Sequence, residues 1–211
     1  MQLRMTNRLR FAATVLLALL VATAAWAAPI TGTVTNASTG KPAAGVAVTL
    51  VDPMGGMAEL ATAKSDAQGR FSIDAPAAQG PRLARAEMGG VNYFKMISPG
   101  TTSVDLEVYE AASKVQGVSG SADVVKMQTQ DGQLQAVELF AIKNQSSPPK
   151  TLVSKQTFEF VLPEGAVIDN ADAQAPNGQP ISTQAAPAKE KNHYAFSFAL
   201  KPGGCRSRLH C

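Results

Sequence analysis

Histidine, cysteine and tryptophan are scarce in this chain of 211 residues, which contains two histidines, two cysteines and one tryptophan. A zinc site needs three or four protein ligands, and a catalytic base needs a nucleophile beside it. His193 has no other histidine or cysteine within ten residues, so it is predicted to be an ordinary surface residue. The composition therefore predicts no catalytic residue, no metal site and no cofactor.

Long helical patterns are also missing, as is any apolar run after the first 27 residues that is long enough to span a membrane. Glycine and proline are plentiful, with 17 and 13 residues, and valine and threonine recur at every second position in many segments. Alternation with a period of two is typical of half-buried strands. We therefore expect an all-β protein.

The first 27 residues have the features of a cleaved secretory signal. Three arginines precede an apolar run at residues 11–25, and Ala25-Trp26-Ala27 places small residues where a signal peptidase selects them. The run is shorter than the roughly 20 residues that a membrane anchor requires. We predict cleavage between Ala27 and Ala28 and a secreted or periplasmic protein, located in the cell envelope or outside it.

The mature chain that remains after cleavage lacks a surplus of positive charge. The chain has 19 Lys and Arg against 16 Asp and Glu, and the excess consists of Arg4, Arg8 and Arg10 in the signal. A neutral mature protein without a basic cluster is not expected to bind nucleic acid or an anionic membrane. An unknown protein or a polysaccharide remains as the expected partner.

Residues 30–74 form the clearest pattern in the chain. Four alternating segments (30–36, 45–53, 57–65 and 70–74) are separated by segments rich in turn-forming residues. They predict short strands of one small β-sandwich. The turn at Asp66-Ala67-Gln68-Gly69 is expected to close a hairpin with the strand that follows it.

Within these residues the order G-T-V-x-N, G-K-P-x-x-G-V-x-V-x-L and S-D-x-x-G-x-F resembles the carboxypeptidase regulatory-like domain, a transthyretin-like, Ig-like sandwich. The resemblance implies a non-catalytic scaffold or binding accessory, as this module is in many secreted and surface proteins. Zinc carboxypeptidases need His-x-x-Glu, and neither His193 nor His210 is followed by Glu at that spacing. The resemblance therefore brings no active-site residue.

The domain division follows the alternating pattern. A hairpin at Gly89-Gly90 is expected to join strands at 81–88 and 91–97, and Val104 to Val108 ends a first domain at residues 28–110. Residues 111–122 are small and polar and predict a linker. Its Gly117-Val118-Ser119-Gly120 lacks the last glycine of a nucleophile elbow and is expected to be a loop.

Residues 123–203 predict a second antiparallel sandwich. Asp131-Gly132 signals a hairpin that pairs Thr129 with Leu134 and Met127 with Ala136, with a β-bulge near Ala136 or Val137. Strands are expected at 156–162 and 193–200. The polar residues 169–191 predict a long surface loop, with one short strand at Ile181.

The tail, residues 204–211, differs in composition from everything before it, since it holds both cysteines. A disulfide between Cys205 and Cys211 is one interpretation. A metal site made of Cys205, His210 and Cys211 is a second, with only three ligands. The third is that the reading frame is lost or the chain is cut short, which leaves the second sandwich incomplete.

The functional hypotheses follow from this inventory. The first is a non-catalytic scaffold or binding accessory, and the alternative is a carbohydrate-binding module. Sugar-binding surfaces stack rings on exposed aromatic side chains, for which only Tyr93, Tyr109 and Tyr194 are candidates. No residue is singled out as ligand-binding. Two glycosylation-like triplets, at Asn36 and Asn144, are interpreted as ordinary turns.

Overall fold

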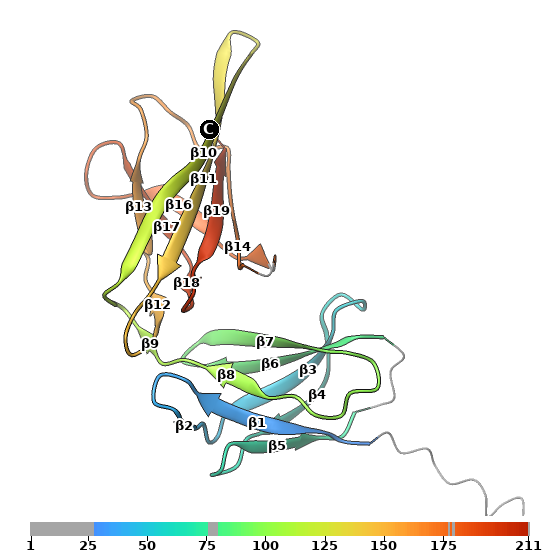
Figure 1. Ribbon diagram of the computed structural model, residues 1–211. Coiled ribbons are helices and arrows are strands. Elements are labelled where there is room, and N and C mark those ends of the chain that lie inside the picture. Colours follow the sequence, from blue (N-terminus) through green and yellow to red (C-terminus); the bar gives the residue numbers. More distant parts are fainter. Residues whose placement is uncertain (1–27, 76–79, 177, 179, 211) are drawn as a thin grey trace, which may run out of the picture.

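The computed structural model describes residues 28–210 apart from 76–79, 177 and 179. The described residues form strands and loops without a helix, so the all-β prediction is confirmed. None of them forms a helix of the length and apolarity that a membrane crossing requires. The predicted signal, residues 1–27, lies outside the described part. Figure 1 shows two β domains, one above the other, joined at a narrow waist.

Two sheets form the first domain. One contains β2-β1-β5, with β8 added parallel to β1, and the other has the order β4-β3-β6-β7. The strands are β1 (Ile30–Asn36), β2 (Lys41–Pro42), β3 (Ala47–Asp52), β4 (Ala58–Lys64), β5 (Arg70–Ile73), β6 (Arg82–Met88), β7 (Val91–Ile97) and β8 (Leu106–Val108). The hairpin predicted at Gly89-Gly90 is confirmed, because Met88 pairs with Val91.

The core of this domain lies between the two sheets. Ile30 and Val34 on β1 pack with the inward residues of β3, where Val48 and Leu50 are fully buried. Gly32 on β1 allows the close approach of the loop before β8, since a Cβ there would lie 1.8 Å from the Val104 carbonyl oxygen. The alternation in the sequence therefore matches the inward positions of Ile30 and Val34 on β1, whereas β3 is buried at four consecutive residues.

The turn at Asp66–Gly69 exists, but the predicted hairpin is wrong. The Asp66 carboxylate accepts hydrogen bonds from the backbone N–H groups of Gln68 (2.9 Å) and Arg70 (2.8 Å). However, β4 pairs with β3 and β5 pairs with β1, so the turn crosses from one sheet to the other. Local turn chemistry does not specify which strand the chain pairs with after the turn.

The second domain also has two sheets, β10-β11-β19-β14-β15 and β13-β17-β16. Its strands are β10 (Val118–Gln130), β11 (Gln133–Asn144), β13 (Phe158–Val161), β14 (Asn170–Gln174), β15 (Pro180–Ile181), β16 (Gln184–Pro187), β17 (His193–Ser197) and β19 (Cys205–His210). Phenylalanine rings fill the space between them: the Phe160 and Phe196 centroids are 4.7 Å apart, and Phe140 contacts both. The strands expected at 156–162 and 193–200 are confirmed in outline.

The Asp131-Gly132 hairpin has the predicted register, with Thr129 opposite Leu134 and Met127 opposite Ala136. The predicted position of the bulge is wrong. The register shifts between Ala122 and Val124 on β10, and β11 runs through Ala136 without interruption. Apolar residues occupy both faces of β11, so the alternation in the sequence could not show which strand carries the extra residue.

Residues 169–191 are not the predicted long loop. They contain β14, β15 and β16, and only the short strand at Ile181 was expected. The strand β14 pairs with β19 over five residues, although Ala173 is its only fully buried side chain. Main-chain pairing holds these short strands with few apolar side chains, which is why the apolar pattern did not reveal them.

The expectation that the residues after 203 stand apart from the strands of the second sandwich is wrong. Residues 205–210 form β19, which pairs with β11 on one side and β14 on the other. Cys205, Ser207 and Leu209 point into the domain, whereas Arg206 and Arg208 are exposed. The tail therefore alternates like any strand, and its unusual composition concealed this pattern.

Candidate functional site

A group of polar side chains that bond to one another lies where the two domains meet. A small sheet of β9 (Ala111–Ala112), β12 (Thr151–Val153) and β18 (Ala199–Leu200) occupies this junction. The strand β12 pairs in parallel with β9 and antiparallel with β18. The predicted linker at 111–122 is therefore wrong, because it contains β9 and the start of β10. The small residues Ala111 and Ala112 of β9 pair with β12 through their main chains.

Tyr93 connects the domains from the first one. Its side chain is 4% exposed, and its hydroxyl donates to the Tyr109 carbonyl oxygen at 3.0 Å. Thr151 Oγ1 of the second domain lies 2.8 Å from the same hydroxyl and is fully buried. Since Tyr93 has one proton and donates it to a carbonyl, Thr151 is the donor in this second bond. Burial raises the pKa of Tyr93, which keeps the phenol neutral.

Ser38 makes a second connection. Its hydroxyl donates to the Pro149 carbonyl oxygen at 2.5 Å and accepts from the Glu110 backbone N–H at 2.8 Å. The Glu110 carboxylate pairs with the Lys150 ammonium at 3.0 Å, and the Glu110 carbonyl accepts from the Thr151 N–H. Residues from the first domain and from the second domain thus bond to one another within a few ångströms.

Lys201 closes the junction from the end of β18. Its ammonium donates to the Asn92 carbonyl oxygen at 2.5 Å and lies 4.9 Å from the Tyr93 ring centroid and 5.6 Å from that of Phe94. Burial lowers the pKa of Lys201. The contacts place a cation over aromatic faces, an arrangement that is stabilising in partly desolvated sites.

The junction also uses both glycosylation-like triplets. Asn144 is buried, and its side-chain amide donates to the carbonyl oxygens of Lys150 (2.8 Å) and Leu200 (2.9 Å). Asn36 is buried too, and its side-chain oxygen accepts from the Ser38 N–H at 3.0 Å. Asn36 and Asn144 are the last residues of β1 and β11, and each side-chain oxygen accepts from the N–H two residues later, where a turn begins. Sequence reasoning did not find the junction, because its residues come together only through tertiary pairing.

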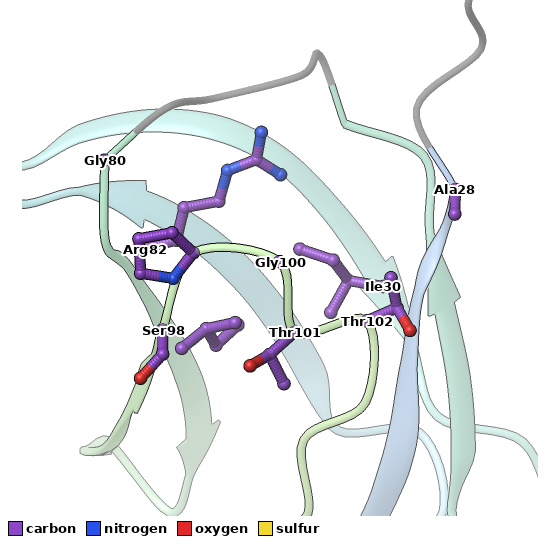
Figure 2. A pocket seen from close by; sticks show the side chains of 10 residues that line it. Ala28, Ile30, Gly80, Arg82, Ser98, Gly100, Thr101 and Thr102 are labelled. Carbon is purple, nitrogen blue, oxygen red and sulfur yellow. The ribbon is translucent and has the colours of Figure 1, made fainter.

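A small pocket of about 160 Å³ lies at the end of the first domain away from the junction (Figure 2). Ile30, Arg82, Ile97 and Thr101 line it, with the loop at 98–102 along one side. Its volume is about half of the roughly 300 Å³ at which small-molecule sites begin. Arg82 is the only titratable side chain in its lining, so the pocket does not bring together groups for acid–base chemistry.

His193 lies where the sequence placed it, at the start of β17, but it is paired. Its Nδ1 is 2.7 Å from Glu159 Oε1, and its Nε2 is 3.5 Å from Glu190 Oε2. Ser119, expected in a loop, lies in β10 opposite Lys143. Within the described part of the chain, no three His, Cys, Asp or Glu side chains are grouped to hold a metal ion.

Cys205 is buried and carries a free thiol. Its side chain faces the core of the second domain from β19, and burial raises its pKa to about 11. Cys211, the second partner in that disulfide and a ligand in the suggested metal site, lies outside the described residues, and the side chain of His210 is not described. The disulfide between Cys205 and Cys211 therefore stays a prediction.

The three tyrosines considered for sugar binding do not form a shared surface. Tyr93 is buried at the junction, and its ring centroid is 5.8 Å from that of Tyr109. The Tyr109 hydroxyl donates to Glu107 at 3.3 Å. Tyr194 stacks on Phe160 at the edge of the other domain's core. Tyr93 and Tyr109 thus pack against each other, and Tyr194 packs separately in the second domain.

One comparison with known proteins agrees with the fold of the first domain. Residues 29–108 match the family model described as carboxypeptidase regulatory-like domain, so the resemblance is confirmed for the first domain. No curated protein matches the chain. Among solved structures it is similar to the major pilin SpaA of Corynebacterium diphtheriae, at 11% identity and a TM-score of 0.31, over 87% of this chain and 57% of that one. The chain thus spans little more than half of that pilin's length, and the likeness assigns no function.

Proposed function

We propose that the mature chain is a secreted or cell-envelope scaffold that does not catalyse a reaction. In this proposal the regulatory-like domain and the second sandwich act as one rigid spacer, which presents surfaces to a protein or polysaccharide partner. The family of the first domain is non-catalytic, which supports the proposal that this protein does not catalyse a reaction.

The observation that carries the proposal is the junction. Tandem domains joined by a flexible linker change orientation freely, whereas domains with a well-packed interface move together. Here Tyr93, Thr151 and Lys201 bond across the boundary, and β9 pairs with β12. A protein whose most elaborate polar network serves to fix the angle between two domains is suited to a mechanical or spacing role.

A carbohydrate-binding role is the less favoured candidate. The tyrosines that would stack on sugar rings are buried or packed against neighbouring residues, as described above. The pocket at Ile30 and Arg82 is smaller than a typical ligand site.

Fractionation of the expressed protein tests the location that this proposal assigns to it. The full chain is produced in a bacterial host, the cells are fractionated, and the intact mass of the product is measured. We expect a product that starts at Ala28 in the periplasm or the medium, because residues 1–27 have the features of a signal. A product in the cytoplasm that retains residues 1–27 would contradict the proposed location.

A further inference from the structure

The first and last strands of the first domain lie side by side and run in the same direction (Figure 1). β8 pairs in parallel with the second half of β1, where Thr35 lies opposite Glu107. A bridge between Thr31 and Ser103 extends the contact to the first half of β1. We call β1 with residues 102–108 the parallel pair. The chain enters the domain at one end of this pair and leaves it at the other.

Tension along the chain acts on the parallel pair in one defined direction. A pull on the residues before β1 and on those after β8 draws the two strands in opposite directions along their common axis. Hydrogen bonds between paired strands run across that axis, so the pull loads all of them together. A pull on both strands at the same end would instead break the bonds one after another, which needs less force.

Main-chain hydrogen bonds fasten the parallel pair at both of its ends. The Thr31 N–H donates to the Thr102 carbonyl oxygen at 2.9 Å, and the Val104 N–H donates to the Thr31 carbonyl oxygen at 2.9 Å. At the other end the Ala37 N–H donates to the Val108 carbonyl oxygen at 2.8 Å. The two strands are thus connected from the start of β1 to the residue after its end.

Side chains strengthen the middle of the parallel pair. The Asp105 carboxylate accepts hydrogen bonds from the hydroxyl and from the backbone N–H of Thr33. On the core side, Val34 and Val108 are fully buried and Leu106 is buried, which keeps water away from the pair on that side. In addition, β5 pairs with the other edge of β1. β1 is therefore held from both sides.

The second domain repeats this arrangement with one strand in between. β10 and β19 both pair antiparallel with β11, so they run in the same direction along its two edges. The chain enters this domain through β10, and β19 is the last described strand. A pull on the two ends of the domain therefore also slides paired strands along each other, at Val118–Gln130 on one edge of β11 and at Cys205–His210 on the other.

We propose that the protein bears tension along its chain direction, with the parallel pair of the first domain and the strands β10, β11 and β19 of the second loaded in shear. This inference rests on the proposed function as a spacer, and it adds the direction in which the spacer is strong. A spacer that connects two partners transmits any force between them. Both domains, and the pairing of β9 with β12 at the junction, lie in the path of that force.

The test is the unfolding of single molecules of the mature chain, residues 28–211 with Cys211→Ser, under constant force. One arrangement applies the force between Ala28 and residue 211. The other applies it between Ala28 and a Thr101→Cys attachment, because Ala28 and Thr101 line the same pocket at one end of the parallel pair (Figure 2). The extension released on unfolding identifies the domain, since each residue adds at most about 3.6 Å.

The first domain should resist the force along the chain better than the force across one end. At equal force it should last about tenfold longer or more in the first arrangement, the factor expected when one or two more hydrogen bonds must break together.

Two variants locate the resistance within the first domain. Asp105→Ala removes two hydrogen bonds of the parallel pair and should make the domain unfold about fivefold faster under force along the chain. Ser65→Ala is the matched control, because the Ser65 hydroxyl donates to the Ala43 carbonyl oxygen and accepts from the Val46 N–H, away from the parallel pair. It should lower the urea midpoint but leave the rate of unfolding under force unchanged, since its bonds are still intact when β1 detaches.

Two results would overturn the proposal. One is a first domain that unfolds equally fast in both arrangements, and the other is Ser65→Ala accelerating unfolding under force as much as Asp105→Ala does. Neither result affects the proposed function, which export of the product and the rigidity of the junction decide separately. A chain that is exported and rigid but unfolds easily along its axis would be a spacer that carries no load.

Discussion

Asp105 shows how one exposed carboxylate can hold two strands together. It lies just before β8, and its Oδ1 accepts hydrogen bonds from the Thr33 hydroxyl (2.6 Å) and the Thr33 backbone N–H (2.9 Å) on β1. The side-chain hydrogen bond from Thr33, followed by the one from its N–H, lowers the pKa of Asp105 below 3.8. The ionised form is therefore the one that stabilises the parallel pairing of β1 with β8.

Replacing Asp105 with alanine should lower the free energy of unfolding at pH 7 by roughly 1 kcal/mol, the typical contribution of such hydrogen bonds. A lowered native pKa stabilises the protein above the unfolded value of 3.8, and this contribution disappears as the pH falls through the native pKa. Urea unfolding at pH 7 and at pH 3 should thus show a difference between wild type and variant that shrinks in acid. Glu87→Ala, at an exposed site on β6, serves as a control. A difference that grows in acid would contradict this role.

Cys205 should be protected from alkylation in the folded protein. In the Cys211→Ser variant at pH 8, iodoacetamide should leave the intact mass unchanged during a period in which the urea-unfolded chain is fully labelled, because the thiol is buried. The raised pKa adds a second expectation. The unfolded thiol ionises near 9.0 and the folded one at about 11, so Cys205 makes the protein less stable as the pH rises between these values. Rapid labelling of the native variant would contradict the inward position of Cys205.

At the scale of single residues, the sequence predicted which side chains are buried better than it predicted which hydrogen bonds they make. Alternation placed Val34, Phe160 and Phe196 inside, as observed. Asp105 gave no such signal, since its partner Thr33 lies 72 positions away in the sequence. Tyr93 was considered only as a candidate for stacking on sugar rings, and its bond to Thr151 depends on how the domains dock. Such contacts follow from tertiary structure and have no local pattern.

At the scale of elements, β19 is the clearest correction. It lies between β11 and β14 in the five-stranded sheet, and Leu209 on it is completely buried among the core residues of the second domain. Residues 205–210 were predicted to lie outside the second domain, because cysteine and arginine are rare in the sequence that precedes them. Its period-two alternation was the usable signal, and six residues were too few for that signal to outweigh composition.

Replacing Leu209 with alanine should therefore destabilise the protein by about 2–5 kcal/mol, the usual cost of a large-to-small change in a packed core. Urea unfolding followed by circular dichroism measures the change. Arg206→Ala, three residues earlier on the exposed side of the same strand, should change stability by less than about 0.5 kcal/mol. Equal and small effects of the two substitutions would mean that residues 205–210 do not belong to the sheet.

The element pattern was most informative in the first domain. Most of its strands at 30–97 could be placed before the structure was known, although β2 had been assigned to a turn. A second exception was the crossing at Asp66–Gly69, where the chain changes sheets. In the second domain, short strands such as β14 and β16 are held mainly by main-chain pairing, which leaves little trace in the apolar pattern.

At the scale of the whole molecule, the central feature is the fixed contact between the two sandwiches. Ser38, Tyr93 and Asn92 of the first domain bond to Pro149, Thr151 and Lys201 of the second, and Ala199 packs against the first domain's core. The sequence predicted a flexible linker in this region, because small and polar residues serve equally well in linkers and in short paired strands. Only the docking of the domains distinguishes the two.

Residual dipolar couplings of backbone N–H groups in the mature chain, residues 28–211, test this central claim most directly. Couplings from the first domain and from the second domain are fitted separately to the structure in one alignment medium. If the junction fixes the two sandwiches as one rigid spacer, both sets should give the same alignment tensor in magnitude and orientation. Tensors of clearly different magnitude for the two domains would mean that they move independently, and would contradict the account.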